Sequence, residues 1–329
     1  MKVVVSTFPF SRTSSEPLNI LRQSGLEFKL NDKGRKLSGE ELYELAHDAT
    51  AVIVGTEDLS FLIEKSQTLK LIARIGIGLD SVPLQICKDK GIKVCYTPDA
   101  VTDAVAELTL GMMISLTRQI HTADKAIRNK GWQRFEGKSL NEQTIGLLGF
   151  GRIGLRVAEM LSPFKPVKIL VNDILDKKDE IQQLKNLGLN IFQVSFDELV
   201  TQSEIISLHV PKTPKTENLI TEDVLSKMQR DILLINTARG GIINESDLIK
   251  FLNSGHVAGA GLDVFNKEPY FGEFCNSEKV ILTQHMGSCS VEARKRMEKE
   301  TVEDVIHFFK DEPLISPVDL DKEISLLKV

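Results

Sequence analysis

The first hundred residues alternate short apolar runs with segments in which apolar residues recur at helical spacing. The apolar runs are expected to be strands: Val3–Val5, Leu26–Leu30, Ala51–Val54, Leu69–Ala73 and Ile92–Cys95. The segments between them are expected to be helices: Leu18–Gln23, Glu40–Ala46, Leu59–Lys65 and Leu84–Lys90. Gly25 and Gly91 follow two of these helices, where C-terminal caps belong. Repeated strand–helix units predict a parallel sheet with helices on both faces.

A second alternation begins at Thr144. Its expected strands are Ile145–Leu148, Lys168–Val171, Ile205–His209, Ile232–Ile235, Gly259–Val264 and Val280–Thr283. Between the two alternations, an apolar residue recurs every fourth position from Ala104 to Ile120, which predicts one helix over Thr102–Ile120 with a single apolar stripe. A charge-rich helix is expected over Val291–Phe309. The predicted fold class is therefore α/β, with two Rossmann-like, doubly wound parallel-sheet domains.

Length and charge exclude some classes of protein. A chain of 329 residues is long enough for about two domains of roughly 150 residues. With 41 basic and 46 acidic residues the net charge is −5, which excludes a nucleic-acid binder that relies on bulk positive charge. No apolar run approaches the roughly 18 residues of a membrane span. The four cysteines show no Cys-x-x-Cys pair and no metal-finger spacing, so we expect a reduced, cytoplasmic protein without a metal site.

A glycine-rich loop, Gly149-Phe-Gly151-Arg152-Ile153-Gly154, lies between an expected strand and an expected helix. The first glycine permits a tight turn, the second lets a pyrophosphate approach the backbone, and the third lets helix and strand pack closely. The helix N-terminus then offers free N–H groups and the positive end of its dipole to the anion. In this context the loop predicts a dinucleotide site.

Asp173 selects between the two nicotinamide dinucleotides. It ends the next expected strand, nineteen residues after Gly154, where a carboxylate can accept both ribose hydroxyls and would repel a 2′-phosphate. No arginine occurs from Ile174 to Lys178, which favours NAD. NADP is the less favoured alternative, since Lys177 and Lys178 follow closely.

Three further segments each follow an expected strand and carry reactive side chains. They are Asn236-Thr-Ala-Arg239-Gly-Gly, Leu262-Asp263-Val-Phe-Asn-Lys-Glu268-Pro and Thr283-Gln-His285-Met-Gly-Ser. The carboxyl ends of parallel strands meet at one edge of a sheet, and ligands bind there in open α/β folds. A carboxylate anchor, an acid and an imidazole are therefore expected to converge.

With these segments in this order, the chain resembles the D-isomer-specific 2-hydroxyacid dehydrogenase family, which includes phosphoglycerate, lactate and glycerate dehydrogenases. The resemblance runs from Ile72-Ala-Arg-Ile-Gly-Ile-Gly-Leu-Asp80 to the last long helix. It implies a flavodoxin-like substrate-binding domain over residues 1–100, completed by 286–329, and an NAD-binding Rossmann domain over 101–285, with a cleft between them. It also implies a homodimer that pairs through the Thr102–Ile120 region.

The chemistry of 2-keto acid reduction gives three residues catalytic roles under this resemblance. Arg239 would hold the substrate carboxylate with a bidentate fork that lysine could not reproduce. His285 would donate the proton to the ketone oxygen, or accept it during alcohol oxidation. Glu268, bonded to the far nitrogen of the imidazole, would favour the imidazolium, raise the histidine pKa and fix the ring orientation.

The resemblance also implies which residues contact the ligands. Asp263 would contact the nicotinamide carboxamide, and the glycines of the Arg74 segment would let backbone N–H groups reach the substrate carboxylate. The residues expected to contact NAD are Gly149, Gly151, Arg152, Ile153, Gly154, Asp173, His209, Val210, Pro211, Thr237, Ala238, Arg239, Asp263, His285 and Gly287. Those expected to contact the substrate, a small 2-hydroxy or 2-keto acid, are Arg74, Ile75, Gly76, Ile77, Arg239 and His285.

Two departures from the family leave alternatives open. Most relatives carry proline immediately before the catalytic histidine, whereas this chain carries Gln284, which restores a backbone N–H. No arginine occurs at Val54-Gly55-Thr56, where a second phosphate anchor is expected in phosphoglycerate enzymes. 3-Phosphoglycerate therefore stands beside glyoxylate, glycerate/hydroxypyruvate or a longer 2-keto acid, and formate is disfavoured because formate dehydrogenases lack the glutamate that Glu268 provides. An NAD(H)-sensing corepressor of the same fold is the alternative from a different class.

Overall fold

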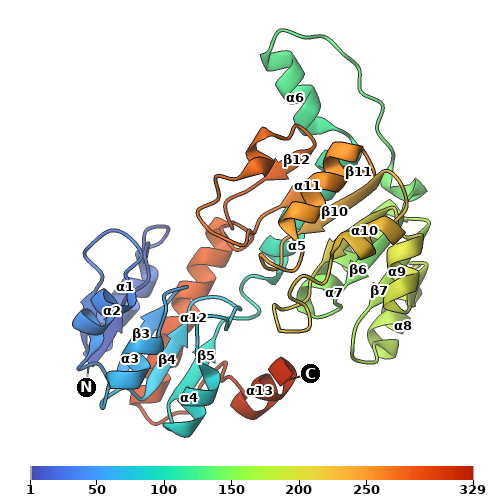
Figure 1. The fold of residues 1–329 in the computed structure, drawn as a ribbon. Coiled ribbons are helices and arrows are strands. Elements are labelled where there is room, and N and C mark those ends of the chain that lie inside the picture. Colours follow the sequence, from blue (N-terminus) through green and yellow to red (C-terminus); the bar gives the residue numbers. More distant parts are fainter. Residues whose placement is uncertain (1, 329) are drawn as a thin grey trace. The chain divides into compact units, whose positions relative to one another are not determined.

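The computed structural model describes residues 2–328, which divide into two compact units. The discontinuous unit contains the residues up to Val101 together with those from Ser288 onward. The central unit is Thr102–Gly287. Each unit is an α/β sandwich around one parallel sheet, so the predicted fold class is confirmed (Figure 1).

The discontinuous unit contains a five-stranded parallel sheet in the order β2-β1-β3-β4-β5, which is the flavodoxin-like order. Its strands are β1 (Lys2–Val5), β2 (Glu27–Leu30), β3 (Ala51–Val54), β4 (Leu71–Arg74) and β5 (Lys93–Tyr96). Its helices are α1 (Glu16–Gln23), α2 (Gly39–Ala46), α3 (Ser60–Lys65), α4 (Leu84–Asp89), α12 (Val291–Phe309) and α13 (Leu320–Lys328). Every residue of β3 is buried, as expected for a strand covered on both faces, whereas the edge strand β2 has no buried residue.

The chain returns to this unit after residue 287 and completes its core. Ser290 caps α12 by accepting a hydrogen bond from the Ala293 N–H at 3.1 Å. Beyond α12, the Val318 N–H donates to the Val94 carbonyl of β5 at 2.8 Å. Val318 and Ile324 are both 8% exposed and belong to the same apolar cluster as the residues of β3 and β4. The C-terminal segment is therefore part of this unit's core.

The central unit contains a seven-stranded parallel sheet in the order β12-β11-β10-β9-β6-β7-β8. Its strands are β6 (Thr144–Leu148), β7 (Lys168–Asn172), β8 (Ile191–Gln193), β9 (Ile205–Leu208), β10 (Ile232–Asn236), β11 (Val257–Leu262) and β12 (Val280–Leu282). Its helices are α5 (Thr102–Thr117), α6 (Ile120–Arg128), α7 (Arg152–Leu161), α8 (Lys178–Asn186), α9 (Phe196–Gln202), α10 (Glu222–Lys227) and α11 (Glu245–Ser254). The strand order reverses between β6 and β9, which is where ligands bind in doubly wound sheets.

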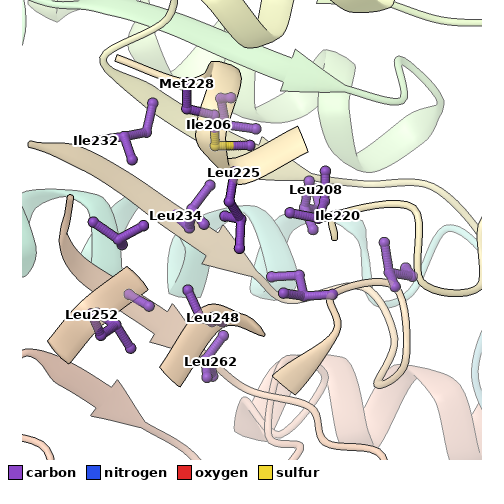
Figure 2. Close-up of a cluster of buried hydrophobic side chains, with 14 of the residues drawn as sticks. Ile206, Leu208, Ile220, Leu225, Met228, Ile232, Leu234, Leu248, Leu252 and Leu262 are labelled. Atoms are coloured by element: carbon purple, nitrogen blue, oxygen red, sulfur yellow. The ribbon is translucent and has the colours of Figure 1, made fainter. Parts of the chain in front are cut away.

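Apolar side chains fill both faces of this sheet. Figure 2 shows one face, where Leu234 and Leu262 of β10 and β11 pack with Leu248 and Leu252 of α11. A second cluster on the other face joins β6 and β7 to α5 and α7. Burial on both faces fixes the strand register, and therefore fixes where each strand ends.

The predicted helix over Thr102–Ile120 is wrong in two respects. Gln119 adopts a left-handed conformation with φ of 50°, which ends α5 at Thr117 and starts α6 at Ile120. The expected single apolar stripe is also wrong, because Val105, Thr109 and Met113 are buried as well. The helix packs against α7, β10 and β11 together, so it is enclosed within its own unit on more than one side.

Among the helices of residues 2–328, none combines the length and the apolar composition that crossing a bilayer requires.

Candidate active site

The residues expected to contact NAD all lie at the carboxyl edge of the central sheet. The glycine-rich loop joins β6 to α7, Asp173 follows β7, and His209 follows β9. Thr237–Arg239 follow β10, Asp263 follows β11, and His285 follows β12. The structure therefore brings these loops to one edge of one sheet.

The glycines of the phosphate loop are required by close contacts. Gly149 has φ of 92°, and a Cβ there would lie 2.7 Å from the backbone carbonyl carbon and oxygen of His209. A Cβ on Gly154 would collide with the Gly149 carbonyl oxygen, which explains the close packing of α7 on β6. At Gly151, in contrast, a Cβ would meet nothing within 4 Å. This open space at the N-terminus of α7 fits a bound pyrophosphate.

Asp173 holds the phosphate loop from the neighbouring strand. Its Oδ2 accepts a hydrogen bond from the Phe150 N–H at 2.6 Å, and its Oδ1 accepts one from the Leu175 N–H at 2.9 Å. Each carboxylate oxygen can accept a further hydrogen bond, so a ribose hydroxyl can still bind. Asp173 thus couples the loop to the predicted ribose position.

We expect Asp173→Ala to raise the use of NADPH relative to NADH about 10- to 100-fold, because the carboxylate that repels a 2′-phosphate is gone. The absolute rate with NADH should fall, since the loop loses its Phe150 contact. The measurement is the ratio of kcat/KM for the two cofactors with one keto acid. Asp176→Ala is the matched control, because Asp176 is an exposed aspartate that pairs with Lys178. An unchanged ratio in Asp173→Ala would contradict the assignment.

His209 lies at the reversal of strand order, next to the phosphate loop. Its N–H donates to the Leu148 carbonyl at 2.7 Å, and its ring Cδ2 would lie 3.6 Å from a Cβ on Gly154. Burial lowers the pKa of the His209 imidazole to about 4, so the ring is neutral at physiological pH. Its buried Nε2 has no hydrogen-bond partner among the described residues. A neutral imidazole thus packs beneath the loop without adding charge.

A buried asparagine shapes the turn that carries Arg239. Asn236, 2% exposed, accepts from the Ala238 N–H at 3.1 Å and donates from Nδ2 to the Arg239 carbonyl at 2.9 Å. The Nη1 of Arg239 donates to the Ala238 carbonyl at 2.7 Å. A Cβ on Gly240 would collide with the backbone of Phe265. The Arg239 turn and the segment leading to Glu268 are therefore packed backbone against backbone.

His285 and Glu268 form the pair that the sequence predicts. The Nδ1 of His285 lies 2.8 Å from the Oε2 of Glu268, while Glu268 Oε1 accepts from the Phe265 N–H at 3.1 Å. Burial alone raises the pKa of Glu268, but the hydrogen bond and charge of His285, the Phe265 N–H and the charge of Arg239 together outweigh it and lower the pKa. The Glu268 carboxylate thus orients the imidazole ring of His285 through a charged hydrogen bond.

Glu268→Gln is therefore expected to lower kcat for keto-acid reduction about tenfold, because the ring of His285 loses the charged hydrogen-bond partner that orients it. Initial rates with saturating NADH and saturating keto acid measure kcat. Glu273→Gln, at an exposed glutamate, is the matched control. An unchanged kcat in Glu268→Gln would exclude the pair from the chemistry.

Asp263 is almost fully buried and bonds to the loop that carries His285. Its Oδ1 accepts from the Thr283 hydroxyl at 2.5 Å and from the Met286 N–H at 2.8 Å, and its Oδ2 accepts from the Gly287 N–H at 2.9 Å. Its main-chain carbonyl accepts from the His285 N–H at 2.7 Å. The predicted contact between Asp263 and the nicotinamide carboxamide stays a prediction.

The predicted substrate segment Arg74–Ile77 begins at the last residue of β4 in the discontinuous unit. The Ile75 N–H donates to the Val54 carbonyl at 2.9 Å and the Gly76 N–H donates to the Thr97 hydroxyl at 2.8 Å. Gly76 has φ of 114°, and a Cβ there would lie 2.7 Å from Arg74 Nη1, so the guanidinium folds over this glycine.

In the part of the chain that the structure describes, no group of three or more histidine, cysteine, aspartate or glutamate side chains is placed to hold a metal ion.

Sequence reasoning did not single out Asn236, Gly240 or Thr283. Asn236 and Thr283 carry a signal, since a polar residue at the buried end of a strand often bonds to the turn that follows. Gly240 carries no such signal, because glycine is needed there only to avoid a collision with the backbone of Phe265, 25 residues later in the chain. These residues shape the site without presenting reactive groups.

Comparison with known proteins gives consistent matches. Residues 110–287 match the family model described as "D-isomer specific 2-hydroxyacid dehydrogenase, NAD binding domain". The chain is 36% identical over 297 residues to a glyoxylate reductase of Thermofilum pendens, covering 87% of this chain and 86% of that protein. It is 36% identical over 277 residues to a hydroxypyruvate reductase of Thermotoga maritima, covering 82% and 88%. The D-lactate dehydrogenase of Aquifex aeolicus, solved with NAD and lactic acid, superposes with a TM-score of 0.81 at 28% identity, covering 95% of this chain and 96% of that one.

Proposed function

This chain belongs to the D-isomer-specific 2-hydroxyacid dehydrogenase family, and from that premise we propose that it reduces a small, unphosphorylated 2-keto acid such as glyoxylate or hydroxypyruvate. It is an NAD-dependent oxidoreductase that acts on the CH–OH group of 2-hydroxy acids. The observation that carries the proposal is the 2.8 Å contact between His285 Nδ1 and Glu268 Oε2, beside the Arg239 turn.

Each residue of the central unit has a separate role in the proposed reaction. Gly151 and the N-terminus of α7 would hold the pyrophosphate of NADH, and Asp173 would hold its ribose. When bound there, NADH would supply the hydride for C2 of the keto acid. Arg239 would bind the substrate carboxylate and orient C2. His285 would deliver a proton to the ketone oxygen, which completes the hydroxyl group, and Glu268 would orient the ring of His285.

The charge around β3 and β4 supports an unphosphorylated substrate. Val54 pairs with Arg74 across these strands, so the loops that follow them leave the sheet side by side. The β3 loop carries Glu57, whose Oε2 accepts from the Gly55 N–H at 2.6 Å and whose side chain is buried. Arg74 supplies one basic side chain here, which suits the single carboxylate of an unphosphorylated acid, and the Glu57 carboxylate disfavours a second anionic group such as a phosphate.

A panel of 2-keto acids tests the proposal. Purified protein is mixed with NADH and glyoxylate, hydroxypyruvate, pyruvate, a longer 2-keto acid or 3-phosphohydroxypyruvate, and the loss of nicotinamide absorbance is followed. We expect the highest kcat/KM with glyoxylate or hydroxypyruvate. A preference for the phosphorylated acid would overturn the substrate assignment. NADH binding without turnover across the panel would favour the NAD(H)-sensing corepressor-like protein.

We also propose that the protein works as a homodimer. The predicted apolar stripe of α5 packs within its own unit, so it does not support a dimer interface. Support comes from α6 and the segment after it, which project from the central unit in Figure 1. They expose Ile120, Ile127 and Trp132 at 51%, 54% and 84%, an apolar surface typical of subunit interfaces.

Light scattering at micromolar concentration is expected to give twice the 36.7 kDa mass of the chain. Ile127→Glu combined with Trp132→Glu should give the monomer mass, because charges then replace the apolar contact. A monomer mass for the unchanged protein would contradict the proposal.

We propose that the protein is located in the cytoplasm. Cys87, Cys95, Cys275 and Cys289 are all free thiols, which suits a reducing compartment.

A further inference from the structure

The backbone of His285 adopts a conformation that is uncommon for residues other than glycine. Its φ is 51°, in the left-handed region that disfavours residues with a Cβ. The residue lies in an exposed loop after β12, so burial of its own side chain does not impose this conformation. Hydrogen bonds of the loop are therefore expected to stabilise the left-handed form.

Two consecutive N–H groups after His285 point to one carboxylate. The Met286 N–H donates to Asp263 Oδ1 and the Gly287 N–H donates to Asp263 Oδ2, at 2.8 and 2.9 Å. A left-handed residue within a short turn points successive N–H groups to one side and creates an anion-binding concavity. The carboxylate of Asp263 fills this concavity, and its main-chain carbonyl accepts from the His285 N–H.

A hydroxyl fixes the carboxylate in turn. The Oγ1 of Thr283 donates to Asp263 Oδ1 at 2.5 Å, a short distance typical of a hydroxyl bonded to a carboxylate. Asp263 is 1% exposed, so protein donors replace water around it. Hydrogen bonds to a buried carboxylate are strong, and the loss of one leaves the group under-solvated.

We propose that Thr283 and Asp263 are positioning residues for His285: their bonds set the left-handed backbone that points the imidazole at Glu268. The inference rests on the proposed function, in which His285 transfers the proton. The geometry links the two parts, because the ring that meets Glu268 at 2.8 Å belongs to the residue directly before the two N–H groups that donate to the carboxylate. Residue 284 adds no proline restraint, since it is glutamine.

Kinetics of three variants test the proposal. Thr283→Val keeps the shape of the side chain and removes its donor, and we expect kcat for keto-acid reduction to fall about tenfold with NADH affinity within about twofold of the wild type. Thr283→Ser keeps the donor and should restore kcat to within about twofold. Asp263→Asn should lose more, because an amide N–H₂ would face the loop N–H groups. Thr201→Val is the matched control, since the hydroxyl of the exposed Thr201 donates to main-chain carbonyls of its own helix.

A double variant separates positioning from a general loss of structure. If Thr283→Val loosens the loop, the contact between His285 and Glu268 weakens, so Thr283→Val and Glu268→Gln combined should lower kcat little more than the larger of the two single changes. A role confined to stability would lower the melting temperature, and the losses of kcat in the two single variants would then multiply.

An NMR measurement gives a reading that does not depend on turnover. The imidazole nitrogens of ¹⁵N-histidine protein are observed at one pH, and the His285 signal is assigned by its absence from His285→Asn. We expect the chemical shift of this signal to change in Thr283→Val and to return in Thr283→Ser, because the ring changes its contact with Glu268. If no keto acid is turned over but the chemical shift changes, the proposed function fails and the positioning role stands. A wild-type chemical shift and a wild-type kcat in Thr283→Val would overturn the positioning role.

Discussion

Replacing His285 with alanine is expected to lower kcat for keto-acid reduction about 100- to 10,000-fold, the range that positioned proton transfer contributes. The ring is exposed at 43% and bonds through one nitrogen to Glu268, so its removal should leave the fold and the phosphate loop intact. NADH affinity should stay within about twofold of the wild type, because the pyrophosphate contacts lie on other loops. Stopped-flow reduction and NADH fluorescence titration measure the two quantities.

The control for this change is His47→Ala. His47 is an exposed histidine at the end of α2, with a ring nitrogen 3.2 Å from the Glu44 carbonyl. It should keep wild-type kinetics. If His285→Ala keeps more than about a tenth of the wild-type kcat, another group supplies the proton and the mechanism is wrong.

Replacing Arg239 with alanine is expected to lower kcat/KM for the keto acid about 100- to 1,000-fold, with most of the loss in KM. Two charge-assisted hydrogen bonds to the substrate carboxylate disappear in this variant, and bonds of this kind bind and orient together. Arg239→Lys keeps the charge but not the planar fork, so it should recover only part of the loss. Added guanidinium ions should partly rescue Arg239→Ala and leave Arg239→Lys unchanged.

NADH affinity is the second measurement on these variants. Because Arg239 is predicted to contact the cofactor as well, a loss of a few fold is consistent with its position after β10. An equal loss of NADH affinity and keto-acid use in Arg239→Ala would show that the guanidinium serves the cofactor and not the substrate.

Short sequence patterns predicted the helix ends and turns, which depend on the conformation of a few neighbouring residues. Gly25 and Gly91 adopt φ of 74° and 66° after α1 and α4, as expected for glycines that end helices. The glycine-rich loop lies between β6 and α7 for the same reason. Gln119, in contrast, separates α5 from α6 although neither glycine nor proline marks the break. The apolar periodicity therefore predicts one continuous helix there. The strand β8 has three residues, too few for an alternation to be visible.

Some contacts of the site join residues far apart in the chain, and sequence patterns do not predict them. Family order was enough to pair His285 with Glu268, and the structure brings them into contact. The bonds from Thr283, Met286 and Gly287 to Asp263 span 20 to 24 residues and involve backbone N–H groups, which have no sequence signature.

The return of the chain to its first unit has a consequence for biosynthesis. When a ribosome has released residues up to Gly287, the central unit is complete in sequence, whereas β5 still lacks the Val318 main-chain bond and the apolar cover of Ile324. Domains fold as units during synthesis, so we expect residues 102–287 to fold first, and the sheet of β1–β5 to complete its core only after the segment from Ser288 onward has been synthesised.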